Sequence, residues 1–124
     1  MKSSILLIWI IILFAACKKD KSTDKLLAAT LILPAKDQIY TGGNSLPNSQ
    51  TYTEFKWSTV KNAYTYDLII KNLSTGLIIT KTTGTNDNWI ILPNKTSFSW
   101  YVIARTAQTE TYSISDTWDF SLPQ

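Results

Sequence analysis

Hydrophobic and polar residues alternate with a period of two through most of the chain after residue 26. No segment there keeps apolar residues at helical spacing for more than two turns, so the pattern predicts strands. The expected strands cover residues 28–33, 52–58, 64–71, 77–83, 88–92, 97–106 and 117–122. Between the first two, Gly42-Gly43-Asn44 and Pro47-Asn48-Ser49 predict a polar loop. Seven short strands with turn signals between them are typical of an all-β fold, a seven-stranded antiparallel β-sandwich of about 100 residues.

The amino-terminal segment has a different pattern. Residues 5–14 form an unbroken apolar run, which follows Lys2 and ends in Ala15-Ala16-Cys17. The run is too short to span a bilayer comfortably, since a spanning helix needs about 20 residues. Its length and the small residues that follow it are typical of a cleaved secretory signal.

The end of this run adds a more specific indication. Leu13-Phe14-Ala15-Ala16-Cys17 resembles the lipobox of bacterial lipoproteins, in which the cysteine is lipidated and becomes the mature amino terminus. The resemblance implies a signal peptide over residues 1–16 and lipid attachment at Cys17. Phe14 departs from the aliphatic residue that the motif prefers three places before the cysteine. The alternative is an ordinary signal peptide that ends near Ala16, with an incidental cysteine.

A charged segment follows the cysteine. Residues 18–25 read KKDKSTDK, with six charges in eight residues. Such a sequence cannot bury apolar surface, so residues 17–26 are expected to be the lipidated cysteine and a solvated tether. Enterobacterial lipoproteins that stay in the inner membrane usually carry Asp where this chain has Lys18, so the resemblance implies the outer membrane. The charged run is also similar to the export signal of Bacteroidetes lipoproteins, which implies display at the cell surface.

Several segments of the strand-rich part carry recognisable motifs. They are Trp57 to Ile70 (WSTVKNAYTYDLII), Leu92 to Ala104, Ser115 with Trp118-Asp119-Phe120, and Leu33 to Asp37. Together they resemble the strand signatures of fibronectin type III modules in bacterial surface proteins. The resemblance covers about residues 30–122, and it implies one fibronectin type III-like, or immunoglobulin-like, domain over residues 27–124.

Two positions depart from that family's pattern. Phe98 stands where the family usually has the tyrosine of the tyrosine corner, so the corner hydroxyl bond is lost. Asn62 replaces a turn glycine, although Asn also tolerates left-handed backbone geometry. Both motifs concern packing, and neither carries chemistry.

Charge and composition exclude several functions. The chain has 124 residues and a net charge of +3. Residues 1–26 hold five Lys against two Asp, whereas residues 27–124 balance seven cations with seven carboxylates. The excess lies outside the expected fold, so nucleic-acid binding is not expected.

Catalytic chemistry also lacks the residues that it needs. One Cys and no His exclude a Cys/His zinc site, a Ser-His-Asp group and an internal disulfide. Glu54 and Asp67 are the carboxylates that the strand order could bring together, and nothing in the sequence indicates a cleft around them. We expect a non-enzyme without metal or cofactor.

Large side chains fall into an inward and an outward set. Trp57, Tyr66, Trp100 and Trp118 fall on inward faces and are expected core residues. Ile69, Trp89, Tyr101 and Ile103 fall on outward faces and form the candidate binding surface. The third and sixth strands are neighbours in this topology, so three of these should form one apolar patch. The alternative is that they are scattered exposed residues, or that a one-residue register slip buries them.

Two binding functions are compatible with these observations, and a third possibility is a spacer with no ligand of its own. The first is a lipid-anchored envelope module that binds protein partners through its single domain. The second is a glycan-binding accessory lipoprotein, similar to those of polysaccharide-uptake systems, in which outward aromatic rings such as Trp89 and Tyr101 stack on sugars.

Overall fold

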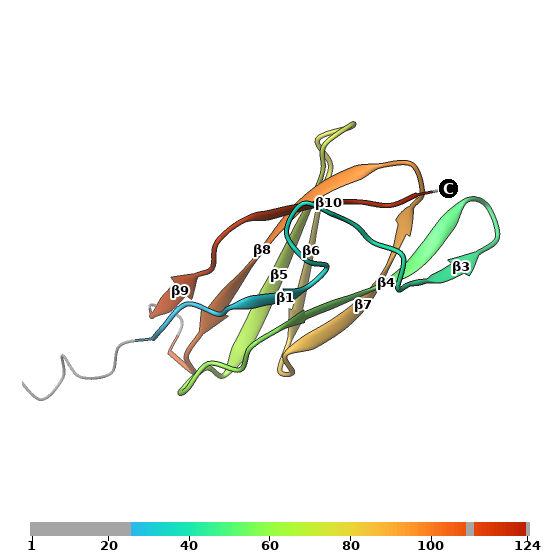
Figure 1. Cartoon of the computed structure of the whole chain (residues 1–124). Helices are drawn as coiled ribbons and strands as arrows, with labels where there is room; N and C mark the ends of the chain where they lie inside the picture. The colour runs from blue at the N-terminus through green and yellow to red at the C-terminus, as the bar shows by residue number, and fades with distance from the viewer. Residues whose placement is uncertain (1–25, 109–110, 124) are drawn as a thin grey trace, which may run out of the picture.

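The computed structural model describes residues 26–108 and 111–123, and that part of the chain is all-β, with ten strands in two sheets and no helix (Figure 1). The strands are β1 Leu31–Leu33, β2 Gln38–Ile39, β3 Asn44–Leu46, β4 Gln50–Trp57, β5 Thr65–Asn72, β6 Ile78–Thr83, β7 Asp87–Pro93, β8 Ser97–Arg105, β9 Tyr112–Ile114 and β10 Trp118–Ser121. The signal peptide, Cys17 and residues 18–25 of the tether lie outside the described residues.

Each sheet is organised around one or two long strands. In the four-stranded sheet, β4 pairs with β7 along one edge and with both β3 and β1 along the other. In the six-stranded sheet the order is β6, β5, β8, and the far edge of β8 pairs with both β9 and β10. The short strand β2 adds to β10 in parallel, and the other pairings are antiparallel. This arrangement is compatible with an immunoglobulin-like or fibronectin type III-like β-sandwich.

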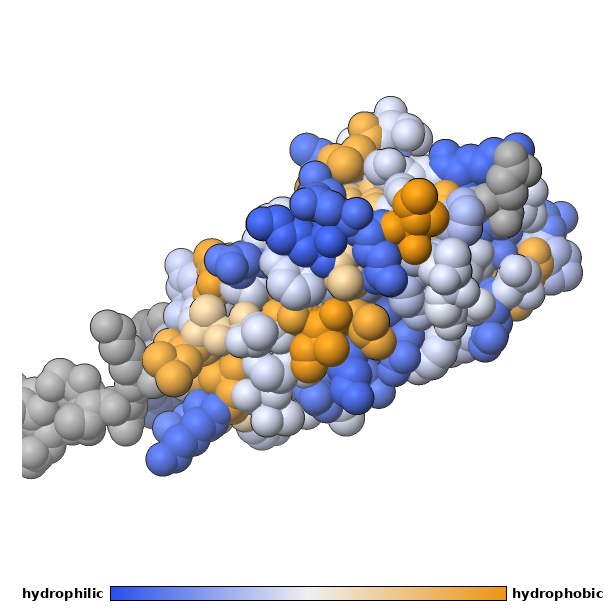
Figure 2. All heavy atoms as spheres, in the orientation of Figure 1, coloured by the Kyte–Doolittle hydropathy of each residue, from blue (hydrophilic) through white to orange (hydrophobic). Residues whose placement is uncertain are grey.

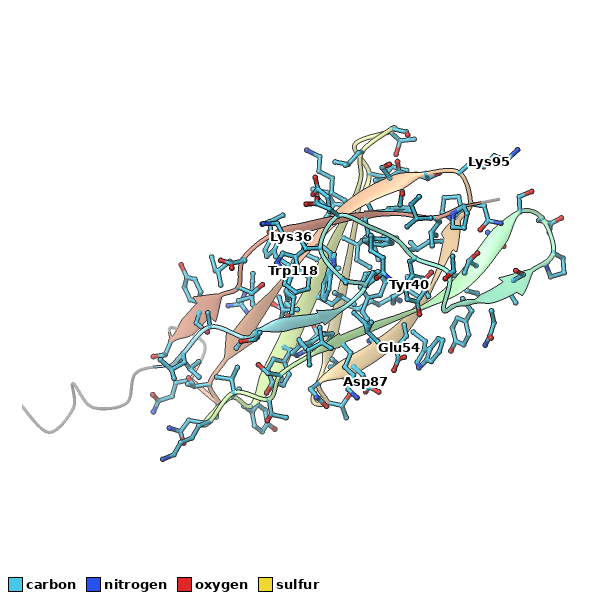
Figure 3. All side chains as sticks on the ribbon, viewed as in Figure 1. Lys36, Tyr40, Glu54, Asp87, Lys95 and Trp118 are labelled. Atoms are coloured by element: carbon cyan, nitrogen blue, oxygen red, sulfur yellow. The ribbon has the colours of Figure 1, made fainter. Side chains whose placement is uncertain are left out.

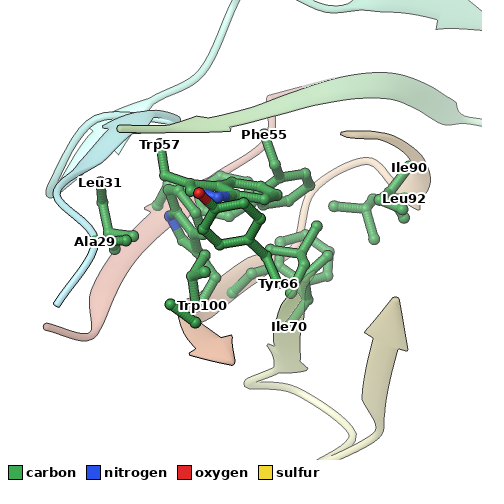
Figure 4. Close-up of a cluster of buried hydrophobic side chains, with 14 of the residues drawn as sticks. Ala29, Leu31, Phe55, Trp57, Tyr66, Ile70, Ile90, Leu92 and Trp100 are labelled. Carbon is green, nitrogen blue, oxygen red and sulfur yellow. The ribbon is translucent and has the colours of Figure 1, made fainter. Parts of the chain in front are cut away.

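The core lies between the two sheets, because alternate residues of their long strands point toward each other (Figure 4). The ring centroids of Phe55 on β4 and Trp100 on β8 are 5.2 Å apart, and those of Trp57 on β4 and Tyr66 on β5 are 5.7 Å apart, both edge to face. Trp57, Tyr66 and Trp100 are buried, as the alternation predicted. Trp118 is only partly buried, and it packs edge-on against Trp100 at 6.5 Å.

The expectation of seven strands was wrong, since β2, β3 and β9 were not expected. The predicted polar loop contains β3, which forms a hairpin with β4 around Asn48 and Ser49, both with positive φ (67° and 57°). A Cβ at Gly43 would lie 2.6 Å from Cγ2 of Thr51 on β4, so the chain comes too close to β4 there for a side chain. Strands of two or three residues are too short to show an alternation.

The ends of the domain also differ from the expected boundaries. The first strand begins at Leu31 rather than at residue 28, although Ala29 is buried. Leu26, which the sequence assigns to the tether, is 8 % exposed and belongs to the core. Between β9 and β10, where strand pairing with β8 is interrupted, the Ser115 hydroxyl accepts a hydrogen bond from the Val102 amide (2.8 Å). The two strands β9 and β10 therefore pair with different parts of the same edge of β8.

The two departures from the family pattern both fit the fold. Phe98 is 1 % exposed and stacks on Phe120 at 5.4 Å, so a hydroxyl there would have to be satisfied inside the core. Asn62 has φ of 70°, the left-handed geometry that its place in the sequence predicted.

Candidate functional site

The four candidate residues lie on two opposite outer faces of the molecule. Ile69 and Tyr101 are direct partners in the register of β5 and β8, and Ile103 is two residues further along β8. All three point outward from the six-stranded sheet, and each is half-buried. Trp89 points outward from β7 in the four-stranded sheet and is half-buried as well. The structure therefore unites three of the four candidates and separates the fourth.

A further apolar residue extends the first group. Ile114 on β9 is the register partner of Ile103 and is 53 % exposed. We call the group Ile69, Tyr101, Ile103 and Ile114 the Tyr101 surface. The sequence analysis missed Ile114 because β9 was not expected, and three residues are too short a segment to predict a strand.

Polar groups border the Tyr101 surface at one end. Arg105 Nε donates to Asp67 Oδ2 at 2.7 Å, and Thr82 Oγ1 donates to Asp67 Oδ1 at 2.7 Å. The Arg105 guanidinium also lies 5.6 Å from the ring centroid of Tyr112, within cation–π range. The carboxylate and the guanidinium thus neutralise each other beside the apolar residues.

The second candidate region is a hollow around Trp89. We call it the Trp89 hollow. Its volume is about 420 Å³, and its lining includes Tyr52, Ile79, Lys81, Trp89 and Ile91. The rings of Tyr52 and Trp89 are 5.0 Å apart and tilted by 36°. Ile79 and Lys81 come from β6, the edge strand of the other sheet, so the hollow lies at the margin between the sheets.

The sequence analysis did not place the partners of Trp89. Tyr52 and Ile91 are register partners on β4 and β7, so their meeting depends on the pairing of those strands. Alternation did predict that Trp89 and Ile91 share a face. The approach of Lys81 depends on how the two sheets pack, which no local pattern encodes.

The described residues offer little for catalysis. Glu54 and Asp67 lie on the outer faces of different sheets, so the strand order does not bring them together. No group of three or more His, Cys, Asp or Glu residues that could hold a metal ion occurs within 26–108 and 111–123. Tyr40 points inward after β2, whereas Glu54 points outward from β4 (Figure 3). Burial raises the pKa of the Tyr40 phenol above its ordinary value, mainly by desolvation.

The side of the molecule that carries β1 and β10 shows small apolar patches separated by hydrophilic residues (Figure 2). A shallow hollow of about 310 Å³ is lined there by residues that include Asp37, Gln38 and Asp119. Two carboxylates with no third ligand do not make a metal site. The Tyr101 surface and the Trp89 hollow are therefore the two candidate sites.

No protein-family model and no curated protein matches this sequence. Among the residues that the structure describes, none belongs to a helix long and apolar enough to cross a membrane.

Proposed function

We propose that the chain is a non-catalytic, lipid-anchored interaction module of the bacterial cell envelope, with one fibronectin type III-like domain that binds a protein partner. The strand pairing supports the domain assignment. The strands that match the seven expected ones divide into β1, β4 and β7 in one sheet and β6, β5, β8 and β10 in the other, which is compatible with such a sandwich. The motif from Trp57 to Ile70 spans the end of β4 and most of β5.

The anchor is proposed at Cys17, with the domain at the outer membrane and displayed at the cell surface. Lipidation there would explain a lone cysteine in an exported chain. A Cys17→Ala variant should incorporate no labelled palmitate when expressed in a bacterium that processes lipoproteins. A Cys17→Ser variant is the matched control, since it keeps the size of the side chain and should also stay unlabelled. Labelling of either variant would remove the anchor from the proposal.

One observation supports the binding of a protein: the Tyr101 surface is a continuous apolar area on the outer face of the six-stranded sheet. Ile69 and Tyr101 lie side by side across β5 and β8, and Ile103 and Ile114 lie side by side across β8 and β9. Apolar areas with a polar border mark interaction sites on soluble domains. The neutralised Asp67–Arg105 pair supplies such a border.

A photocrosslinking amino acid tests this proposal on intact cells. Placed at Tyr101, it should give a discrete protein adduct that disappears when Ile103 and Ile114 are both changed to Ser. Placed at Ile32 on β1, which is 43 % exposed and belongs to the four-stranded sheet, it should not give that adduct. Identical adducts at both positions, or an adduct that survives the double substitution, would contradict a partner on the Tyr101 surface.

The Trp89 hollow favours a second candidate function, the binding of a glycan. A pyranose presents an apolar C–H face that stacks on an aromatic ring, and the hollow offers the rings of Tyr52 and Trp89. Lys81 adds a hydrogen-bond donor to the same hollow. We therefore propose glycan binding here as the alternative to the Tyr101 surface.

A glycan array separates the two functions. The chain from Lys18 onward would be screened together with Trp89→Ala and Tyr101→Ala variants. Retention of a glycan that is lost with Trp89→Ala but kept with Tyr101→Ala would favour the hollow. No retention by the unsubstituted chain would leave the protein partner as the proposed function.

A further inference from the structure

We infer that the end of the domain at which the chain enters is a membrane-facing surface that rests on phosphate-bearing lipid headgroups. This surface consists of Leu27, Lys61, Tyr64 and Tyr112, and we call it the tether end. The inference rests on the proposed lipid anchor, but it concerns the orientation of the domain, which the anchor alone does not determine.

Contacts between distant parts of the chain bring these residues to one end of the sandwich. The Ser113 hydroxyl donates to the Leu27 carbonyl oxygen at 2.9 Å, which ties the entering chain to β9. The Tyr64 amide donates to the Arg105 carbonyl oxygen at 2.6 Å, and Arg105 is the register partner of Tyr112. In Figure 1 the first described residues and β9 lie at one end, and the end of β10 lies at the other, beside β3.

Three large side chains of the tether end are exposed to solvent. Leu27 is 74 % exposed, Tyr64 is 68 % exposed and Tyr112 is 55 % exposed. Tyrosine has an apolar ring and a polar hydroxyl, and it is enriched where protein meets the headgroup region of a membrane. Such residues bury their rings among lipid headgroups without removing the hydroxyl from water.

The length of the tether keeps this end close to the lipid. Eight residues separate Cys17 from Leu26, so the two are at most about 30 Å apart when the chain is fully extended. Leu26 and Ala29 are buried, and therefore the chain belongs to the rigid fold from Leu26 onward. The anchor therefore holds the tether end nearer to the membrane than the opposite end of the domain.

The charge near the tether end also favours a lipid surface as the partner. Residues 18–25 contain four Lys and two Asp, and Lys61 lies at the same end, in the connection between β4 and β5. Arg105 adds no free charge, because Asp67 pairs with it at 2.7 Å. Excess lysine next to a membrane is attracted by anionic headgroups. The partner inferred here is thus a lipid surface, and a protein bound at the tether end is an outcome of the test.

Paramagnetic broadening on vesicles measures the orientation directly. The chain from Cys17 onward contains the whole described core, so it keeps the complete sandwich. Its cysteine would be coupled to a maleimide phospholipid in vesicles of phosphatidylethanolamine and phosphatidylglycerol that carry a gadolinium-chelating lipid. Amide signals of Leu27, Tyr64 and Tyr112 should broaden severalfold more than those of Asn48 and Lys95, which lie in connections at the opposite end.

Two triple variants decide whether the side chains make the contact. Leu27→Ser/Tyr64→Ser/Tyr112→Ser should remove most of the difference between the two ends. The control variant Ile39→Ser/Leu77→Ser/Ile78→Ser changes three residues of similar exposure (63 %, 68 % and 62 %) elsewhere, and it should keep the difference.

Equal broadening at the two ends of the unsubstituted chain would overturn the inference, and so would a difference that survives in the tether-end variant. The same measurement would be repeated in gadolinium-bearing vesicles that lack phosphatidylglycerol. Loss of the tether-end broadening there would support the role of anionic lipid. The inference would also be overturned if an added envelope protein, rather than lipid, contacted the tether end and so prevented the broadening of its amide signals. Chemical coupling replaces lipidation in the cell, so these results do not depend on whether palmitate labels Cys17.

Discussion

Arg105 and Asp67 form an ion pair across neighbouring strands of the six-stranded sheet, with Nε of the one 2.7 Å from Oδ2 of the other. The second carboxylate oxygen of Asp67 accepts a hydrogen bond from Thr82 on β6, and Arg105 lies over the ring of Tyr112 on β9. One carboxylate therefore connects three strands directly and a fourth through the guanidinium. This polar chain crosses the sheet between the Tyr101 surface and the tether end.

The ion pair should contribute modestly to stability. In a double-mutant cycle with Asp67→Ala and Arg105→Ala, we expect a coupling free energy of about 0.5–1 kcal/mol, because Arg105 remains 34 % exposed and water screens the pair. Urea unfolding of the four proteins measures the coupling, which should shrink in high salt. A coupling that salt leaves unchanged would mean that the directed hydrogen bond between the two side chains, rather than screened charge, is what the pair contributes.

The hydroxyl of Tyr66 has a structural role that its neighbour Tyr64 lacks. It accepts a hydrogen bond from the buried Val60 amide at 2.9 Å, so Tyr66→Phe leaves that amide without a partner. We expect a loss of about 1–3 kcal/mol in the free energy of unfolding. Tyr64→Phe is the matched control, since Tyr64 is 68 % exposed and its change should cost almost nothing. Equal stability of the two variants in urea unfolding would show that the bond contributes nothing net.

Phe55 joins the two sheets and should be among the most sensitive core positions. Its ring is fully buried and makes edge-to-face contacts with Trp100 and Phe120 of the opposite sheet. Phe55→Ala should lower the free energy of unfolding by about 3–5 kcal/mol through lost burial and the cavity that remains. Phe55→Leu keeps the protein measurable if the alanine variant does not fold. The exposed control is Ile91→Ala, at 52 % exposure, which should lower the free energy of unfolding by less than about 1 kcal/mol.

Tyr40 should make stability fall at alkaline pH. Burial raises the pKa of its phenol above the ordinary value of 10.0, so the unfolded chain loses this proton at a lower pH than the folded one. The contribution to stability is complete below pH 10 and is lost progressively as the pH rises above it. Thermal unfolding between neutral pH and pH 11 should show a shallower decline for Tyr40→Phe than for the unsubstituted chain. Parallel declines would exclude Tyr40 as the source.

Asn62 should tolerate glycine but not alanine. Its φ of 70° lies in the left-handed region, which alanine adopts at a cost of about 1 kcal/mol, whereas glycine adopts it freely and asparagine more readily than other L-residues. Asn62→Gly should therefore change the melting temperature little, and Asn62→Ala should lower it by several degrees. An alanine variant as stable as the asparagine protein would mean that the turn changes its conformation.

The long strands were predictable because their alternation is local. In β8 every second residue from Phe98 to Ala104 is apolar, and β4 and β5 alternate in part of their length. That pattern alone assigned Trp57, Tyr66 and Trp100 to the core. The same pattern placed Ile69, Tyr101 and Ile103 on an outer face, and their neighbourhood followed from the expected pairing of β5 with β8.

The short strands and the composition of the candidate sites were not predictable in the same way. The strands β2, β3 and β9 have two or three residues each, so their conformation comes from the neighbours that they pair with. Ile114 joins the Tyr101 surface through one of these strands, and the Trp89 hollow gains Lys81 from the opposite sheet.

The sequence by itself thus determined the all-β class, the long strands and most of the core, because each of these depends on the spacing of residues within a single segment. Tertiary structure decided which outward residues meet, why Trp89 lies apart from Tyr101, and which residues surround the entering chain. These depend on pairing and packing between segments, which no single segment encodes.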